Sequence, residues 1–209
     1  MQETNEMQLA ELLMSRLCHD LISPVGAIGN GLELMEEDDD AIAAEAMELT
    51  QQSARRAAWR LQFFRLAFGA SGDRAAIGLK EVQDLAVGFL DGRKTTLEWP
   101  ENAPGSLPAG AARLILLLVL LAADALPRGG VISLAVDSGA SPRLRVGARG
   151  QEAHLRPEVA AALGAGQGEA AIATVAAFFA GRFARRIGAG LGVVGGGDAV
   201  ILEARLAGG

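Results

Sequence analysis

His19 and Asp20 are the neighbouring residues of this chain that are best suited to chemistry, and Ser23 follows one helical turn later. An ordinary histidine side chain is mostly neutral near pH 7, so one ring nitrogen keeps a free lone pair and can act as a nucleophile. A neighbouring carboxylate can hold the opposite ring nitrogen or take its proton. The spacing therefore predicts that His19 is a nucleophile, assisted by Asp20 and Ser23.

Two less demanding interpretations of His19 stay open at this point. It could be a surface histidine with polar neighbours, or it could share a metal ion with Cys18. Metal binding is disfavoured because adjacent residues on a helix point about 100° apart. The other histidine of the chain, His154, lies far away in the sequence.

The sequence weakens its own helix around this histidine. Pro24 cannot donate a hydrogen bond to the carbonyl of Asp20, and its ring clashes with that carbonyl. The three glycines within residues 26–31 each cost up to ~1 kcal/mol relative to alanine. We therefore predict a bend one turn after His19, one carbonyl without its helical partner, and an uncrowded surface around the imidazole.

The predicted helix turns His19 away from its own apolar stripe. At about 100° per residue, His19 lies roughly 200° from Leu17, which belongs to that stripe. The neighbours on the histidine's face are Ser15, Arg16, Ile22, Ser23, Gly26 and Asn30, most of them small or apolar. Such a face obstructs a docking protein little. Arg16 either offsets charge on a group bound at the histidine or is simply solvated.

Two long helices position this face. Apolar residues recur every three or four positions from Met7 to Met35, and a second such pattern runs from about Asp40 to Phe68. The acidic segment 36–40 between them is a predicted turn that supplies an N-capping aspartate. The two helices therefore form an antiparallel hairpin, which we assign to a first domain of residues 1–70.

The hairpin cannot cover both of its apolar stripes by itself. A second copy of the chain is the economical partner, because two hairpins make a four-helix bundle across a dimer interface. The alternative is that the stripes pack on the rest of the same chain. We predict the intermolecular bundle.

A different pattern begins after a boundary at about residues 69–76. The predicted helices are 78–90, 111–126, 157–163 and 169–187, and the predicted strands are 94–99, 131–137, 143–148, 191–194 and 199–206. This order is typical of an α+β domain with helices on a mostly antiparallel sheet. We assign this second domain to residues 76–209.

Composition argues against several classes of function. The formal net charge of −6 disfavours binding to nucleic acid or to an anionic membrane surface, because both require a large positive surface. The longest apolar run, residues 114–126, is interrupted by Asp124 and is shorter than the ~20 residues that span a bilayer. With one cysteine and no basic-then-apolar signal segment, we expect a cytoplasmic protein.

The stretch HDLISPVGAI, from His19 to Ile28, is similar to the H-box of histidine-kinase dimerisation domains. In that motif an acidic residue follows the phospho-accepting histidine, and a small polar residue and a proline stand four and five positions on. Asp20, Ser23 and Pro24 match in place. The continuation GNGLELM and the second domain resemble more particularly the ChpT-type histidine phosphotransferases of alphaproteobacteria. This resemblance covers essentially the full chain, and it implies a dimeric hairpin bundle followed by a Bergerat-like α/β sandwich.

The residues that bind ATP in the kinases are missing from the corresponding positions. The turn at residues 126–130 is kept, but the helix before it carries leucine and alanine in place of the asparagines that hold Mg²⁺ and phosphate. Gly147 stands where an aspartate would bind adenine, and the lid segment 164–171 is a weak match. The resemblance therefore implies a degenerate ATPase-like domain that binds no nucleotide.

The resemblance implies a histidine phosphotransferase in a bacterial multistep phosphorelay. His19 would accept a phosphoryl group from the receiver domain of a hybrid histidine kinase and pass it to response-regulator receivers. Mg²⁺ would come from the receiver, with no cofactor or metal of the chain's own. The expected receiver contacts are Ser15, Arg16, Ile22 and Gly26. Two alternatives remain, a divergent histidine kinase with a residual nucleotide site and a non-catalytic dimeric scaffold.

Overall fold

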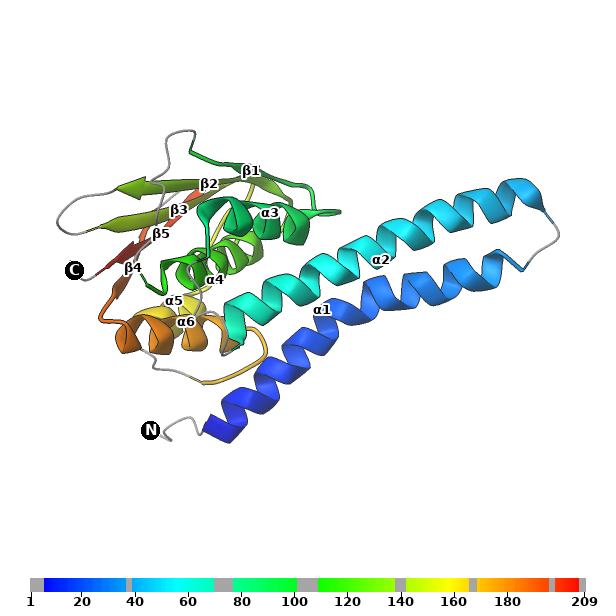
Figure 1. Cartoon of the computed structure of the whole chain (residues 1–209). Coiled ribbons are helices and arrows are strands. Elements are labelled where there is room, and N and C mark those ends of the chain that lie inside the picture. Colours follow the sequence, from blue (N-terminus) through cyan, green and yellow to red (C-terminus); the bar gives the residue numbers. More distant parts are fainter. Residues whose placement is uncertain are drawn as a thin grey trace.

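A computed structural model describes residues 6–36, 39–69, 77–100, 109–137, 142–165, 169–195 and 198–206. A long helical hairpin projects from a layer of helices that covers one side of a sheet (Figure 1). The hairpin consists of α1 (Glu6–Leu34) and α2 (Asp40–Phe68). This agrees with the predicted α+β class and with the predicted pair of antiparallel helices.

The hairpin is held by a cap and by a close helix crossing. The side chain of Asp39 accepts hydrogen bonds from the backbone N–H groups of Ala41 and Ile42, so the acidic turn does supply the N-cap of α2. Gly31 of α1 is buried against α2, and a Cβ at this position would overlap the hydroxyl of Thr50. Gly31 therefore serves helix packing.

The second part of the chain contains four helices and five strands among the described residues. The helices are α3 (Leu79–Leu90), α4 (Ala111–Asp124), α5 (Pro157–Ala165) and α6 (Val175–Arg186). The strands are β1 (Thr95–Glu98), β2 (Gly130–Asp137), β3 (Arg143–Arg149), β4 (Gly190–Gly195) and β5 (Ala199–Arg205). Their order in the sheet is β1-β2-β3-β5-β4. The pair β1 and β2 is parallel and the other pairs are antiparallel, as the predicted mostly antiparallel sheet requires.

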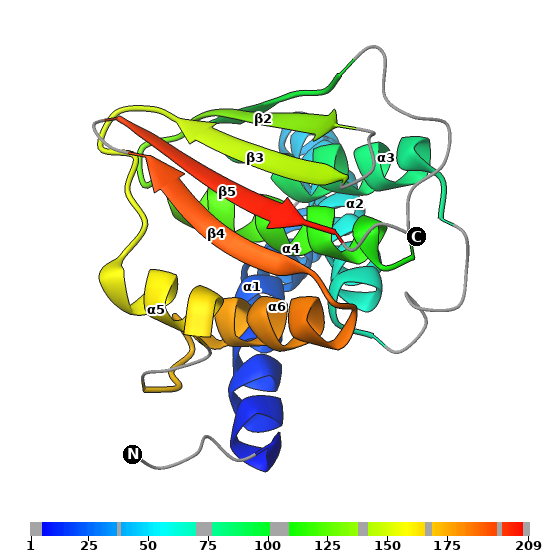
Figure 2. The ribbon, with the colours of Figure 1, turned by 90° about the vertical axis from the view of Figure 1, so that its left-hand side faces the viewer.

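The helix α4 forms the centre of the core. Figure 2 looks onto the outer face of the sheet, with α4 directly behind it. Every residue from Ala111 to Ala123 is buried, because α4 is covered by the sheet on one side and by α2, α3 and α6 on the others. The alternating burial along β3 and β5 shows that the sheet buries one face only.

The end of the hairpin is part of this core. Phe63 of α2 stacks on Phe89 of α3 with ring centroids 4.1 Å apart, and Phe64 meets the same ring edge-on. The hairpin is therefore anchored to the second part by aromatic packing. Most of the boundary expected at residues 69–76 lies outside the described residues.

The chain itself covers only part of the hairpin's apolar stripe: Leu17 packs against the core and Ala57 is buried. Val25, Leu32, Ile42, Leu49 and Leu61 are exposed along α1 and α2. Among the described residues, no helix is both long and apolar enough to cross a membrane.

Candidate functional site

His19 lies on α1 with its side chain 79% exposed. Its Nδ1 atom is 3.2 Å from Oδ1 of Asp20. A carboxylate can only accept a hydrogen bond, so Nδ1 carries the proton and Nε2 keeps the lone pair. In the tautomer that donates to Asp20, the nitrogen with the lone pair is Nε2, which Asp20 does not engage.

Asp20 is itself held by a guanidinium. Nε of Arg16 donates to Oδ2 of Asp20 at 3.0 Å, while Nη2 of Arg16 contacts both carboxylate oxygens of Asp124 at 3.0 Å. Burial alone would lower the pKa of Arg16, but the charges of Asp124 and Asp20 more than offset burial and raise it. The guanidinium therefore stays charged between two carboxylates.

The structure buries Arg16, whereas its position on the histidine's face suggested a solvent-exposed side chain. The residue is only 9% exposed, and its guanidinium is turned from the histidine's face toward the end of α4. Two carboxylates engage the guanidinium, and a contact between Arg16 and a receiver stays a prediction. Its position makes it a support for Asp20.

The carbonyl that Pro24 deprives of its helical partner has another donor. Arg60 of α2 donates a hydrogen bond from Nη1 to the backbone oxygen of Asp20. The helix α1 continues through Pro24, which is buried, and it changes direction partway along its length (Figure 1). Sequence reasoning predicted the bend and the freed carbonyl, but it did not find Arg60.

The other predicted site residues gather around the imidazole. Ser15, Ser23 and Gly26 are exposed on α1, and Ile22 is 72% exposed. The Ser15 hydroxyl donates to the Glu11 carbonyl at 2.9 Å, and no described contact joins Ser23 to the imidazole. A Cβ at Gly26 would meet nothing within 4 Å. The face is therefore open, with small side chains and one large apolar residue.

The comparisons with known proteins decide the family. Residues 79–199 match the family model of the histidine phosphotransferase C-terminal domain. The chain is 40% identical over 157 residues to the protein phosphotransferase ChpT of Brucella abortus (strain 2308), which spans 73% of this chain and 72% of that protein. The chain belongs to the histidine phosphotransferase family. The predicted class of function, phosphotransfer in a two-component phosphorelay, is thereby supported.

A solved structure confirms the fold of this histidine phosphotransferase along its whole length. The structure of a bacterial phosphotransferase shares 31% sequence identity and superposes with a TM-score of 0.79. The match covers 97% of this chain and 98% of that chain. The hairpin and the second domain are therefore both features of that phosphotransferase fold.

A small cavity adjoins the contact between the hairpin and α4. This cavity, of about 230 Å³, lies beyond the end of α4, between Asp124, Pro127, His154 and Arg156. Asp124 is engaged by Arg16, and Nδ1 of His154 is 2.8 Å from the carbonyl oxygen of Glu152. Part of the predicted lid, residues 166–168, lies outside the described residues.

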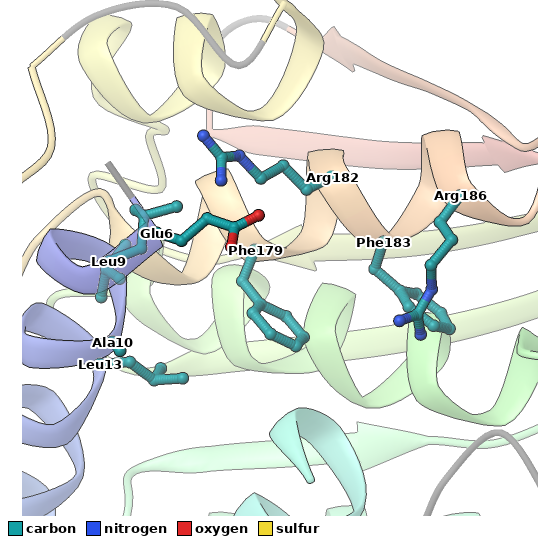
Figure 3. A pocket seen from close by; sticks show the side chains of 9 residues that line it. Glu6, Leu9, Ala10, Leu13, Phe179, Arg182, Phe183 and Arg186 are labelled. Atoms are coloured by element: carbon teal, nitrogen blue, oxygen red, sulfur yellow. The ribbon is translucent and has the colours of Figure 1, made fainter. Parts of the chain in front are cut away.

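A larger groove lies at the far end of α1. It has a volume of about 350 Å³ and lies between the first turns of α1 and the whole length of α6 (Figure 3). Leu9 and Leu13 lie on one side of it and Phe179 on the other, and the side chain of Arg182 extends above Glu6 in this view. His19 is on a later turn of α1 and does not line this groove.

Among the described residues, no three His, Cys, Asp or Glu side chains are grouped closely enough to hold a metal ion. Cys18 is a free, exposed cysteine, and the second histidine lies in the other domain.

Proposed function

We propose that His19 accepts a phosphoryl group from the receiver domain of a hybrid histidine kinase and passes it to the receivers of response regulators. The observation that carries this proposal is the exposed imidazole, whose Nδ1 is engaged by Asp20 and whose Nε2 is left free. Family membership supports the phosphotransfer chemistry.

In the first half of the relay, the lone pair of Nε2 attacks the phosphorus of an aspartyl phosphate. The new N–P bond forms as the P–O bond to the receiver's aspartate breaks, and the electron pair leaves with the regenerated carboxylate. The imidazole becomes a cation that keeps its proton on Nδ1. Asp20 accepts that hydrogen bond and stabilises the positive charge. The second half reverses these bond changes on another receiver.

The chain contributes positioning and a docking face. Ser15, Ile22, Ser23 and Gly26 surround the imidazole with little bulk, so a receiver can bring its aspartyl phosphate within reach. We infer that Mg²⁺ is held by the receiver, because the carboxylate nearest to His19 is already engaged by Arg16 and by the imidazole. We also infer that the protein works in the cytoplasm, where such receivers are found.

We further infer that the second domain binds no ATP. The helix α4 contains no asparagine or glutamine and is buried from Ala111 to Ala123, so it offers no amide side chain to Mg²⁺ or phosphate. An aspartate at position 147, the residue expected to bind adenine, would also be crowded by Ser133, because a Cβ at this position would lie 2.8 Å from the Ser133 Oγ.

Thermal unfolding with and without Mg-ATP tests this inference. We expect no shift of the melting temperature at millimolar nucleotide. A shift of several degrees that saturates in the micromolar range would revive the divergent kinase.

The exposed apolar stripe of the hairpin supports a homodimer. Exposed aliphatic residues of the stripe, such as Val25, Leu32 and Leu49, would be covered if a second hairpin packed against the first as a four-helix bundle. We therefore propose that the working unit is a dimer.

The decisive experiment follows radiolabelled phosphate from a phosphorylated receiver to the protein. Wild type should take up the label and release it to a second receiver, whereas His19→Ala should not. His154→Ala is the matched control, because it removes the other histidine of the chain and should transfer normally. Label uptake by His19→Ala would overturn the site, and no uptake by folded wild type would favour the non-catalytic scaffold.

A further inference from the structure

Asp124 connects the second domain to the hairpin. It is the last residue of α4, and both of its carboxylate oxygens lie 3.0 Å from Nη2 of Arg16 on α1. Its side chain is 29% exposed, so the pair lies at the edge of the interface and is partly screened.

Each contact in this group fixes the next one. The guanidinium of Arg16 is planar, so holding Nη2 against Asp124 also sets the direction of Nε toward Asp20. Arg16 takes Oδ2 of Asp20, which leaves Oδ1 for the imidazole of His19. A continuous series of hydrogen bonds therefore runs from the end of α4 to Nδ1 of the histidine.

We propose that Asp124 is a positioning residue for His19, acting through Arg16 and Asp20, so that the second domain sets the tautomer and orientation of the imidazole. This inference rests on the proposed phosphotransfer at His19. It gives the second domain a part in the chemistry that does not depend on nucleotide.

The charges around Asp20 explain why the loss of Asp124 reaches the histidine. Arg16 and Arg60 both donate to Asp20, and Arg93 lies close enough for Asp124 and Asp20 to act on it electrostatically. Three guanidinium groups thus lie near two carboxylates, although Arg60 donates to the backbone carbonyl of Asp20 and not to its carboxylate. Without Asp124, the carboxylate of Asp20 is the one that remains near these guanidinium groups. Asp20 is then drawn toward the cations, and its hydrogen bond to Nδ1 of His19 weakens. Arg16 also loses the contact that fixes its rotamer.

The test uses Asp124→Asn in the full chain, which keeps the shape of the side chain and removes its charge. Asp91→Asn is the matched control. Asp91 makes the other described ion pair between the hairpin and the second domain, with its Oδ2 3.0 Å from Nε of Arg56, but it belongs to no path to His19. Asp124→Glu serves as the conservative rescue.

Two quantities are measured on each variant. The first is the tautomer ratio of His19, from the ¹⁵N chemical shifts of the ring. The second is the transfer rate from a phosphorylated receiver over a range of receiver concentrations. In Asp124→Asn we expect more Nε2–H tautomer and a maximal rate lower by about ten- to hundredfold, the range for a misplaced reacting group. The half-saturating receiver concentration should not change. Asp91→Asn should match wild type in both quantities, and Asp124→Glu should recover most of the rate.

Several results would overturn the proposal. One is a wild-type tautomer ratio and maximal rate in Asp124→Asn. Another is a rate that falls only in proportion to the folded fraction, with the wild-type tautomer ratio in the protein that remains folded. A third is an additional loss of rate when Asp124→Asn is combined with Arg16→Gln, because a residue that acts through Arg16 adds nothing once Arg16 is gone. These results would leave phosphotransfer at His19 intact, whereas transfer by His19→Ala would end the proposed function itself.

Discussion

Two arginines hold Asp20, one by its carboxylate and the other by its backbone carbonyl. Arg16 comes from the same helix, and Arg60 comes from the facing helix. Pro24 makes the second contact necessary, because its nitrogen has no hydrogen to give to that carbonyl. The proline that bends α1 after the histidine therefore also creates a binding point for α2.

At this scale we predict that Arg60→Met destabilises the fold by about 1–2 kcal/mol, since it leaves a partly buried carbonyl without a donor. Urea unfolding measures the change. Arg55→Met is the control, because Arg55 is exposed on the same helix and should alter stability little. In a Pro24→Ala background, where residue 24 can donate to Asp20, Arg60→Met should cost less. An equal cost in both backgrounds would contradict the pairing.

At the scale of the element, the three glycines of α1 have different roles. Gly31 permits the close approach of α2, and a side chain there would overlap Thr50. A Cβ at Gly26 or at Gly29 would meet nothing within 4 Å. At these two positions glycine lowers the stability of the helix, and helix packing does not require it. At about 100° per residue, Gly26 lies within roughly 20° of His19 around the helix axis, and Gly29 lies about 80° away.

We predict that Gly26→Ala and Gly29→Ala each stabilise the protein by up to ~1 kcal/mol, because alanine favours the helix. Gly26→Ala should nevertheless weaken receiver docking several-fold, since the added methyl group stands on the histidine's face. Gly29→Ala should not. Unfolding free energies and the half-saturating receiver concentration measure the two effects. If both variants dock equally well, the receiver does not approach over Gly26.

At the scale of the whole molecule, the hairpin packs on the second domain at one end and exposes aliphatic side chains farther along. Aromatic packing joins Phe63 and Phe64 to α3, so the hairpin's base moves with the second domain. Farther along, aliphatic side chains face solvent on both helices. A second copy of the chain could cover these exposed aliphatic side chains with its own hairpin.

We predict that Leu49→Glu converts the proposed dimer to a monomer, because a carboxylate would be buried in the proposed bundle interface. Val87→Glu is the matched control, since Leu49 is 51% exposed on the hairpin and Val87 is 52% exposed on α3. Sedimentation velocity at micromolar concentration measures the assembly state. A dimer that survives Leu49→Glu but is lost in Val87→Glu would place the interface on the second domain instead.

The amino-acid sequence by itself indicated the pair His19 and Asp20 as the candidate site, and it predicted the two amphipathic helices and each described strand of the sheet. These features depend on local patterns: the period of apolar residues, the capping aspartate, and the spacing of His19, Asp20, Ser23 and Pro24. Such patterns are set by backbone geometry within a few residues. They can therefore be recognised before the chain is folded.

Only the tertiary structure decided how that pair is supported. On a helical wheel Arg16 belongs to the histidine's face, and nothing in the sequence joins it to Asp124, 108 residues later. A long side chain can reach a partner well away from its own Cα direction, so its role depends on which element packs beside it. The packing of α4 against the hairpin placed a carboxylate within reach of Arg16. Because of that packing, Arg16 is buried and hydrogen-bonded to Asp20, whereas its place on the helical wheel suggested an exposed side chain near a bound phosphoryl group.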